Sequence, residues 1–85
     1  MSDFERGQQI AYVPMHAAGD LTHPDVEFGF VTSVRGDTVF CRYWSKHSLG
    51  ELRTKANSEG ADRRLIVPHQ SRMQSDVDAA LKGYC

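Results

Sequence analysis

Strand-like and helix-like patterns of hydrophobic residues follow one another along this chain. Residues 8–13 alternate between polar and apolar side chains, and residues 27–34 and 38–44 are rich in β-branched and aromatic side chains, as strands typically are. A further short strand is expected over 63–67, where a proline follows, and another near 51–54. The pattern therefore predicts four or five short antiparallel strands.

The segment 27–44 predicts a β-hairpin, because Arg35-Gly36-Asp37 separates its two strands and glycine allows a tight turn. Gly29 lies inside the first of these strands, where a glycine often marks a bend or a bulge. In the second strand, one face carries Val39, Cys41 and Tyr43, and the other carries Phe40, Arg42 and Trp44. The polar stretch that follows, 45–62, is expected to be largely a loop.

The C-terminal segment 69–83 changes to a helical period. Its apolar residues fall at i, i+4, i+7, i+8 and i+11, which places on one stripe Met73, Val77, Ala80, Leu81 and Tyr84. An isolated helix of this length is marginal in water, so we expect the stripe to dock on the chain's own strands. The alternative is a partner or a second copy of the chain, which would form a homodimer through the C-terminal helix.

These elements predict a mainly β fold, in which a small barrel of four or five antiparallel strands is followed by a C-terminal α-helix. The 85 residues amount to a single domain, 1–85, with the barrel over 7–67 and the helix over 69–83. A domain this small has little room for both a core and an enclosed catalytic pocket. Its size therefore favours a binding protein over an enzyme.

Charge is distributed unevenly along the chain. The net charge of -1 argues against uniform electrostatic binding to nucleic acid. Residues 1–41 carry two Arg against six Asp and Glu, whereas residues 42–72 carry seven Lys and Arg against three Asp and Glu. Either the two halves neutralise each other across the fold, or they form one acidic and one basic face.

The two cysteines, Cys41 in an apolar strand and Cys85 at the end of the chain, do not suggest a disulfide framework or a metal motif. Cys41 is expected to behave as a small buried hydrophobic residue. The polar N-terminus lacks the apolar core of a signal peptide, and no segment approaches the roughly 20 apolar residues that span a bilayer. We therefore expect a cytoplasmic protein that makes no contact with a membrane.

The loop between the first two predicted strands concentrates polar donor groups. Four of its side chains offer nitrogen or oxygen atoms within ten residues: His16, Asp20, His23 and Asp25. Aspartates beside glycine and proline commonly accept hydrogen bonds from turn backbone, which would make them architectural. Imidazole and carboxylate groups also bind transition metals or supply a general base, although the spacing His16-x6-His23 is not a known ligand motif. We take the four as candidate binding residues and assign no metal, cofactor or catalytic residue.

A second candidate surface mixes aromatic and basic side chains over residues 40–47. Its members are Arg42, Trp44, Lys46 and His47, with Phe40 on the same strand face as the first two. Single-stranded nucleic acid binds to such mixtures, because bases stack on rings and cations contact phosphates. Exposed Arg and Trp are equally the residues that anchor protein interfaces. Alternatively, Phe40 and Trp44 pack beneath the C-terminal helix, because small barrels need large aromatic residues in their core.

Residues 11–34 carry the pattern His-Ala-x-Gly-Asp-x-x-His-Pro-Asp from His16 to Asp25, and residues 37–43 read Asp-Thr-Val-Phe-Cys-Arg-Tyr. These segments resemble small proteins carried by bacteriophages and prophages, and the resemblance covers roughly residues 7–67. It implies an SH3-like barrel, to which the C-terminal helix is an addition, and an origin in a mobile element. Most proteins of that group have no assigned activity.

The resemblance further implies a non-catalytic module that acts in the cytoplasm of a bacterial host by occupying a site on a host protein. An inhibitor of a host defence system, in the manner of anti-CRISPR proteins, is an example of such a module. The first alternative is an SH3-like barrel that binds nucleic acid, and the second is a metal-binding enzyme.

Overall fold

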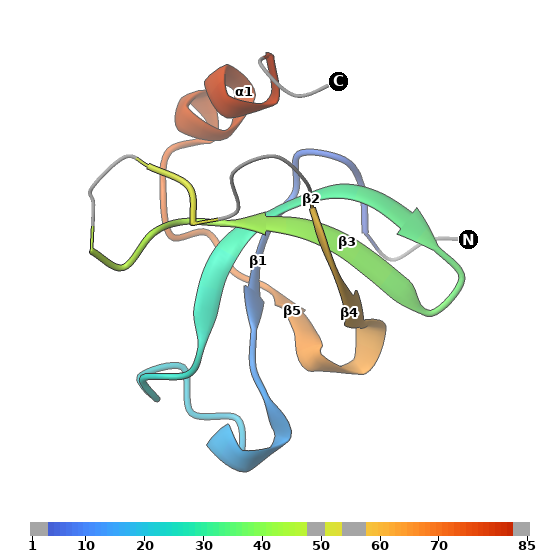
Figure 1. Cartoon of the computed structure of the whole chain (residues 1–85), viewed down its shortest axis with the longest axis vertical. Helices are drawn as coiled ribbons and strands as arrows, with labels where there is room; N and C mark the ends of the chain where they lie inside the picture. Colours follow the sequence, from blue (N-terminus) through green and yellow to red (C-terminus); the bar gives the residue numbers. More distant parts are fainter. Residues whose placement is uncertain (1–3, 48–50, 54–57, 83–85) are drawn as a thin grey trace.

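A computed structural model of the chain describes residues 4–47, 51–53 and 58–82 (Figure 1). Within these residues, five antiparallel strands form one sheet in the order β4-β3-β2-β1-β5. The elements are β1 (Gln9–Tyr12), β2 (Glu27–Arg35), β3 (Thr38–Tyr43), β4 (Glu59–Asp62), β5 (Ile66–Pro68) and the helix α1 (Gln74–Lys82). The expected mainly β fold with a C-terminal helix is therefore confirmed, and the strand order is compatible with an SH3-like barrel.

The predicted hairpin is formed by β2 and β3, which turn at Gly36 with a φ of 58°. Gly29 lies opposite Tyr43 in this pairing, and a Cβ atom at Gly29 would lie 1.9 Å from the carbonyl oxygen of Arg42. The close approach of the two strands therefore requires glycine at this position. The irregularity of the ladder lies between Val31 and Ser33, so the bend or bulge predicted at Gly29 occurs further along β2.

β4 lies in the stretch 45–62, for which the sequence predicts a loop. Its residues, Glu-Gly-Ala-Asp, have weak strand propensity, but they pair with β3 along their whole length. Leu52 forms a single bridge to Trp44, which is all that the described residues show of the strand expected near 51–54. Pairing with a neighbouring strand, and not local propensity, therefore creates β4.

The strand predicted over 63–67 begins later than expected. Residues Arg63–Leu65 form a short 3-10 helix, η2, because the Asp62 carboxylate accepts a hydrogen bond of 2.9 Å from the backbone N–H of Arg64. β5 then includes Pro68, although proline is expected to stop a strand. Proline is tolerated there because β5 is an edge strand of the sheet.

The helix α1 lies at one end of the sheet, away from the loop that joins β1 and β2 (Figure 1). Its apolar side chains join a cluster made of Phe30, Trp44 and Val77, with Ala80 and Leu81 partly buried beside them. Docking on the chain's own strands is therefore confirmed for these residues, whereas Met73 precedes the helix and is 70% exposed, and Tyr84 lies outside the described residues. A homodimer through α1 stays a prediction. No helix in the described ranges combines the length and the apolarity needed to cross a bilayer.

The linker 69–73 is not helical, although a helix is predicted from residue 69 onward. The buried side chain of Gln9 in β1 holds this linker through two hydrogen bonds. Its Oε1 accepts a bond of 3.0 Å from the backbone N–H of Arg72, and its Nε2 donates a bond of 2.7 Å to the carbonyl oxygen of Arg72. Because both backbone groups of Arg72 are bound to β1 in this way, the helix begins only at Gln74.

Cys41 is fully buried in the main core, which confirms the expectation from the sequence. The buried members of this core are Phe4, Ile10, Val31, Val39, Cys41, Tyr43 and Ile66. Burial raises the pKa of the Cys41 thiol from 9.0 to about 12. The sulfur is therefore a neutral thiol throughout the physiological range of pH.

We expect Cys41 to be inert toward thiol reagents in the folded chain, because only an accessible thiolate reacts quickly. Thiol titration of the Cys85→Ser chain at neutral pH should find no reactive sulfur before denaturant is added and one afterwards. The folded pKa of about 12 lies above the usual 9.0, so the unfolded chain loses the proton first. Cys41 therefore lowers the stability of the fold as pH rises through this interval. Rapid reaction of the native chain would contradict the burial.

Opposite charges from the two halves of the sequence meet in the fold. Arg53 contacts Glu27 with 2.6 Å between Nε and Oε1, and it contacts Glu59 with 2.9 Å between Nη1 and Oε2. The first contact joins the basic second half to the acidic first half. It favours the interpretation in which the halves neutralise each other across the fold.

Candidate functional site

Residues 13–26 connect β1 to β2 and form the loop that carries the candidate donor groups (bottom of Figure 1). Two apolar side chains of this loop, Ala17 and Val26, are buried in a cluster with Ala11 of β1. The backbone N–H of Val13 donates a hydrogen bond of 2.8 Å to the carbonyl oxygen of Leu65. The base of the loop is therefore fixed to the sheet, while most of its polar residues stay on the surface.

A backbone reversal brings the two ends of the loop together. After the 3-10 helix η1 (Met15–Ala17), Ala18 and Gly19 adopt left-handed conformations with φ of 52° and 81°. Glycine adopts this conformation freely, whereas alanine pays roughly 1 kcal/mol or more for it. The reversal places His16 opposite Asp25, which lies in the second half of the loop.

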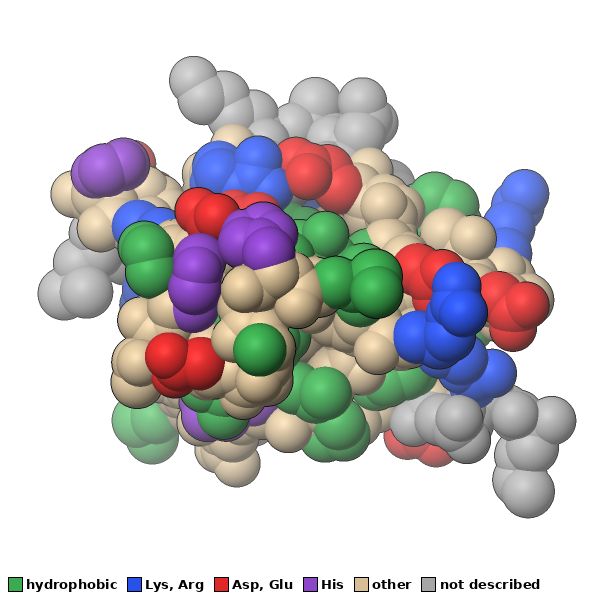
Figure 2. Space-filling model, turned by 90° about the horizontal axis from the view of Figure 1, so that it is seen from below, with side chains coloured by type: hydrophobic (Ala, Val, Ile, Leu, Met, Phe, Trp, Pro, Cys, Tyr) green, Lys and Arg blue, Asp and Glu red, His purple; other side chains and the backbone are tan. Residues whose placement is uncertain are grey.

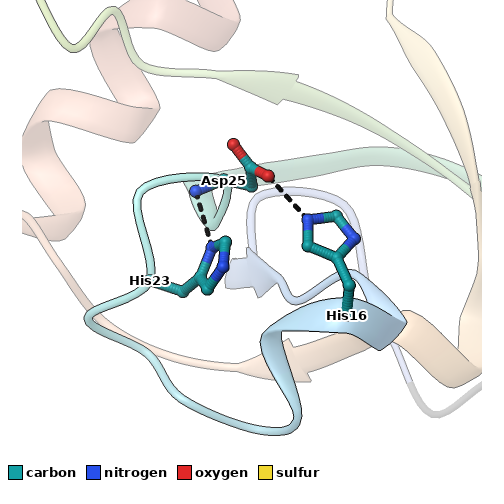
Figure 3. Close-up of side chains that lie close together, drawn as sticks. All are labelled: His16, His23 and Asp25. Atoms are coloured by element: carbon teal, nitrogen blue, oxygen red, sulfur yellow. Dashed lines mark hydrogen bonds and ion pairs between the residues drawn. The ribbon is translucent and has the colours of Figure 1, made fainter.

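The side chains of His16, His23 and Asp25 lie together at the centre of the loop (Figure 3). Nε2 of His16 is 2.6 Å from Oδ2 of Asp25, and the backbone N–H of Asp25 donates a hydrogen bond of 3.0 Å to Nδ1 of His23. The two imidazole rings meet edge to face with their centroids 5.2 Å apart. The side chains of His16 and Asp25 are 61% and 60% exposed, so the cluster faces solvent.

The two aspartates of the loop have different partners. The hydrogen bond with His16 lowers the pKa of Asp25 below its usual value. Asp20 lies outside the cluster and accepts hydrogen bonds from the hydroxyl and the backbone N–H of Thr22, at 2.7 and 2.9 Å, which lower the pKa of Asp20. Asp20 is thus bound to its own turn, as the architectural interpretation predicts.

The cluster of His16, His23 and Asp25 contains the groups of a general base and those of a metal site. An imidazole held by a carboxylate can accept a proton from a substrate, and two imidazoles with a carboxylate can bind a transition metal ion. One nitrogen or oxygen atom of each residue lies within 4.8 Å of the other two. Water has free access to the cluster. A catalytic base usually lies in a pocket from which water is excluded, so the exposure of this cluster does not favour catalysis.

A shallow groove of about 230 Å³ lies beside this loop, and the sequence does not single it out. Its lining residues are Val13, Pro14, Met15, Gly19, Leu21, Arg64, Leu65 and Val67. Three of the four large hydrophobic residues that are exposed in the described chain are among them, namely Met15, Leu21 and Val67, at 84%, 38% and 37%. Figure 2 shows hydrophobic side chains beside the histidines on this face. The signal in the sequence is Met15 and Leu21, the two large apolar residues between Val13 and Val26.

The residues of the second candidate surface, Arg42, Trp44, Lys46 and His47, differ in their exposure to solvent. Lys46 and His47 are exposed, but Arg42 and Trp44 are only 7% and 6% exposed. The expectation that these two side chains are exposed is therefore wrong, and their contact with a partner stays a prediction. Trp44 packs in the cluster beneath α1. For Trp44, the alternative that its large aromatic ring packs beneath the C-terminal helix is confirmed.

Arg72, which the sequence does not single out, lies beside Trp44. Its guanidinium carbon is 4.4 Å from the centroid of the Trp44 ring, within the range of a cation–π contact. Both residues line a pocket of about 340 Å³, together with Phe28, Ser45, Lys46 and Ser71. Arg72 forms no ion pair with another described residue, and the ammonium group of Lys46 donates to the carbonyl oxygen of Pro24. Arg72 is far from Trp44 in the sequence, so no local pattern predicts their contact.

Comparison of the chain with models of known protein families, with curated proteins and with solved structures finds no match. The resemblance to small phage proteins that residues 11–34 and 37–43 suggest therefore stays a prediction. The function must therefore be inferred from the loop, the groove and the pocket.

Proposed function

We propose that the chain is a non-catalytic binding module that contacts another protein through the loop 13–26 and the groove beside it. The observation that carries this proposal is the exposure of Met15, Leu21 and Val67 around one groove. Apolar side chains gathered on the surface of a small domain commonly mark an interaction site. The nearby His16–Asp25 pair would supply part of the polar rim that surrounds the apolar centre of an interface.

The partner is proposed to be a protein of a bacterial host. The resemblance of the loop and hairpin to small phage and prophage proteins supports this origin, and a component of a host defence system is a suitable target. The module would then act in the host cytoplasm. The exposure of both His16 and Asp25 supports a role in recognition, because nothing separates the pair from bulk water.

Capture from a host lysate tests the proposal. The full chain and the Met15→Asp/Leu21→Asp variant are immobilised, and the retained proteins are compared by mass spectrometry. We expect a host protein that binds the unmodified chain and binds the variant at least about tenfold more weakly, because two carboxylates would be buried in an apolar contact. Met73→Asp is the matched control, since Met73 is 70% exposed and does not line the groove.

The proposal would be overturned if Met15→Asp/Leu21→Asp and Met73→Asp weakened binding of the partner equally, or if neither weakened it. Circular dichroism of each variant establishes that the fold is retained. His16→Ala and His23→Ala are also expected to weaken capture without unfolding the chain. Unfolding of these two variants would instead make the histidines architectural.

Binding to single-stranded nucleic acid is the second candidate function, and the Arg72–Trp44 pocket favours it. An arginine plane can stack with a base, and Arg72 and Lys46 can contact phosphate. Fluorescence anisotropy with single- and double-stranded probes should then show affinity that falls steeply with salt and that Arg72→Ala reduces. Arg64→Ala is the control, because Arg64 is paired with Asp62 at 2.8 Å. Absence of binding at low salt would exclude this function.

A further inference from the structure

The spacing of His16 and His23 in the sequence matches no known ligand motif, but the fold brings the two residues together. The left-handed conformations of Ala18 and Gly19 return the chain on itself, so that Nε2 of His16 lies 2.6 Å from Oδ2 of Asp25. One donor atom from each of the three side chains lies within 4.8 Å of the others (Figure 3). We propose that His16, His23 and Asp25 together bind one divalent transition metal ion.

The donor set selects the class of ion. Imidazole nitrogens favour Zn²⁺, Co²⁺, Ni²⁺ and Cu²⁺, whereas Mg²⁺ and Ca²⁺ are bound through oxygen ligands. Bonds of about 2.0–2.2 Å place the ligand atoms of a tetrahedral ion roughly 3.4 Å apart. The separations in the cluster, 2.6 Å for one pair and up to 4.8 Å overall, lie on both sides of that value. Small rotations of exposed side chains therefore suffice, and water would complete the coordination.

Metal binding would exchange hydrogen bonds for coordination bonds. The ion takes the place of the proton between His16 and Asp25. In a neutral His16 ring that proton moves to Nδ1, and a protonated ring releases it to water. His23 gives up the bond that it accepts from the N–H of Asp25, because a ring nitrogen that binds metal uses its lone pair. The exchange costs interactions that the metal-free loop already has, so the site is expected to bind moderately and reversibly.

The scaffold holds the three donors without enclosing them. Ala17 and Val26, which follow His16 and Asp25 in the sequence, are buried at 3% and 2% exposure and fix the backbone on both sides. The side chains of His16 and Asp25 are 61% and 60% exposed. An ion can therefore enter from solvent without opening of the core. The proposed metal site shares His16, His23 and Asp25 with the proposed protein contact, but not Met15 or Leu21. The Met15→Asp/Leu21→Asp variant keeps all three ligands, so it should bind zinc as the unmodified chain does, and failure of one proposal can be told from failure of the other.

Isothermal titration of the full chain with zinc chloride and with cobalt chloride tests the site, and magnesium chloride is the control salt. The expected result is one zinc or cobalt ion per chain, no binding of magnesium, and a visible cobalt spectrum that chelator removes. His16→Ala, His23→Ala and Asp25→Ala should each weaken binding by about tenfold or more, since even the outer partners of metal ligands contribute about that much. His47→Ala and His69→Ala are matched controls and should bind as the unmodified chain does.

The Asp25→Asn variant distinguishes the loss of a metal ligand from a disruption of the loop conformation. An asparagine oxygen can still accept the hydrogen bond from His16, but it lacks the charge that binds the ion. We expect this variant to keep the thermal midpoint of the metal-free chain and to lose most of its affinity for zinc. The absence of zinc and cobalt binding, or binding that His47→Ala or His69→Ala reduces as much as the ligand variants do, would overturn the proposal.

Discussion

Gly29→Ala is expected to lower the free energy of unfolding by about 3 kcal/mol or more, or to prevent folding altogether. The added Cβ would lie 1.9 Å from the carbonyl oxygen of Arg42 and 2.9 Å from the Cα of Tyr43. Both atoms belong to the backbone of β3, so a change of rotamer cannot relieve the overlap, and β2 and β3 must separate. Because small domains have only about 5–15 kcal/mol of stability, the loss would be a large share of the total. Urea denaturation followed by circular dichroism measures it.

Gly60→Ala provides the matched control for this prediction. A Cβ at Gly60 would lie 3.1 Å from Cγ2 of Thr38 and 3.2 Å from Cε1 of Phe40, which are both side-chain atoms. These side chains can move slightly, so the loss should stay near 1 kcal/mol, about the lower end of the cost of overpacking. If Gly29→Ala unfolds at the same urea concentration as the unmodified chain, the close pairing of β2 with β3 is wrong.

The hairpin and the helix could be predicted from the sequence because their signals are local. The β2–β3 hairpin contains β-branched and aromatic residues on both sides of Gly36, and the stripe through Val77 has the period of a helix. β4 has no such signal, since Glu-Gly-Ala-Asp becomes a strand only through its hydrogen bonds to β3. The start of α1 depends on Gln9, which binds both backbone groups of Arg72 from the distant strand β1.

Alternation along β3 distinguished its two faces but did not show that both are covered. One face contributes Val39, Cys41 and Tyr43 to the main core, which the pattern allows. The opposite face would be exposed if one side of the sheet faced solvent. On that basis the sequence predicts exposed side chains at Arg42 and Trp44, whereas both are buried in the structure. The C-terminal helix covers Trp44. Which faces of a small sheet are covered depends on how the whole chain folds, and alternation within one strand does not contain this information.

The candidate loop was predictable in composition and position, but its internal contacts were not. The sequence places four donors within ten residues, and the fold joins three of them while Asp20 binds Thr22. This selection depends on the left-handed conformation of Ala18, a residue that rarely adopts it. The groove is formed by Leu21 and Met15 from the loop and Val67 from β5, and only tertiary structure brings these elements together.

Phe30→Ala is expected to destabilise the chain by about 3–5 kcal/mol, the usual cost of removing a fully buried phenylalanine ring. Phe30 is 0% exposed, and its ring centroid lies 5.5 Å from that of Trp44 in the cluster beneath α1. The loss removes the apolar contacts of the ring and leaves a cavity between the sheet and Val77. Trp44 is the single tryptophan of the sequence, so its fluorescence during urea unfolding reports directly on this cluster.

Phe40→Ala is the matched control, because Phe40 is only partly buried and does not belong to the cluster beneath α1. Partial exposure limits the apolar area that the ring removes from water, so its loss should cost about 1–2 kcal/mol. Losses of equal size in the two variants would mean that the cluster beneath α1 is not a core. In that case the helix would be free to leave the sheet, and the homodimer through α1 would become the better explanation of its apolar stripe.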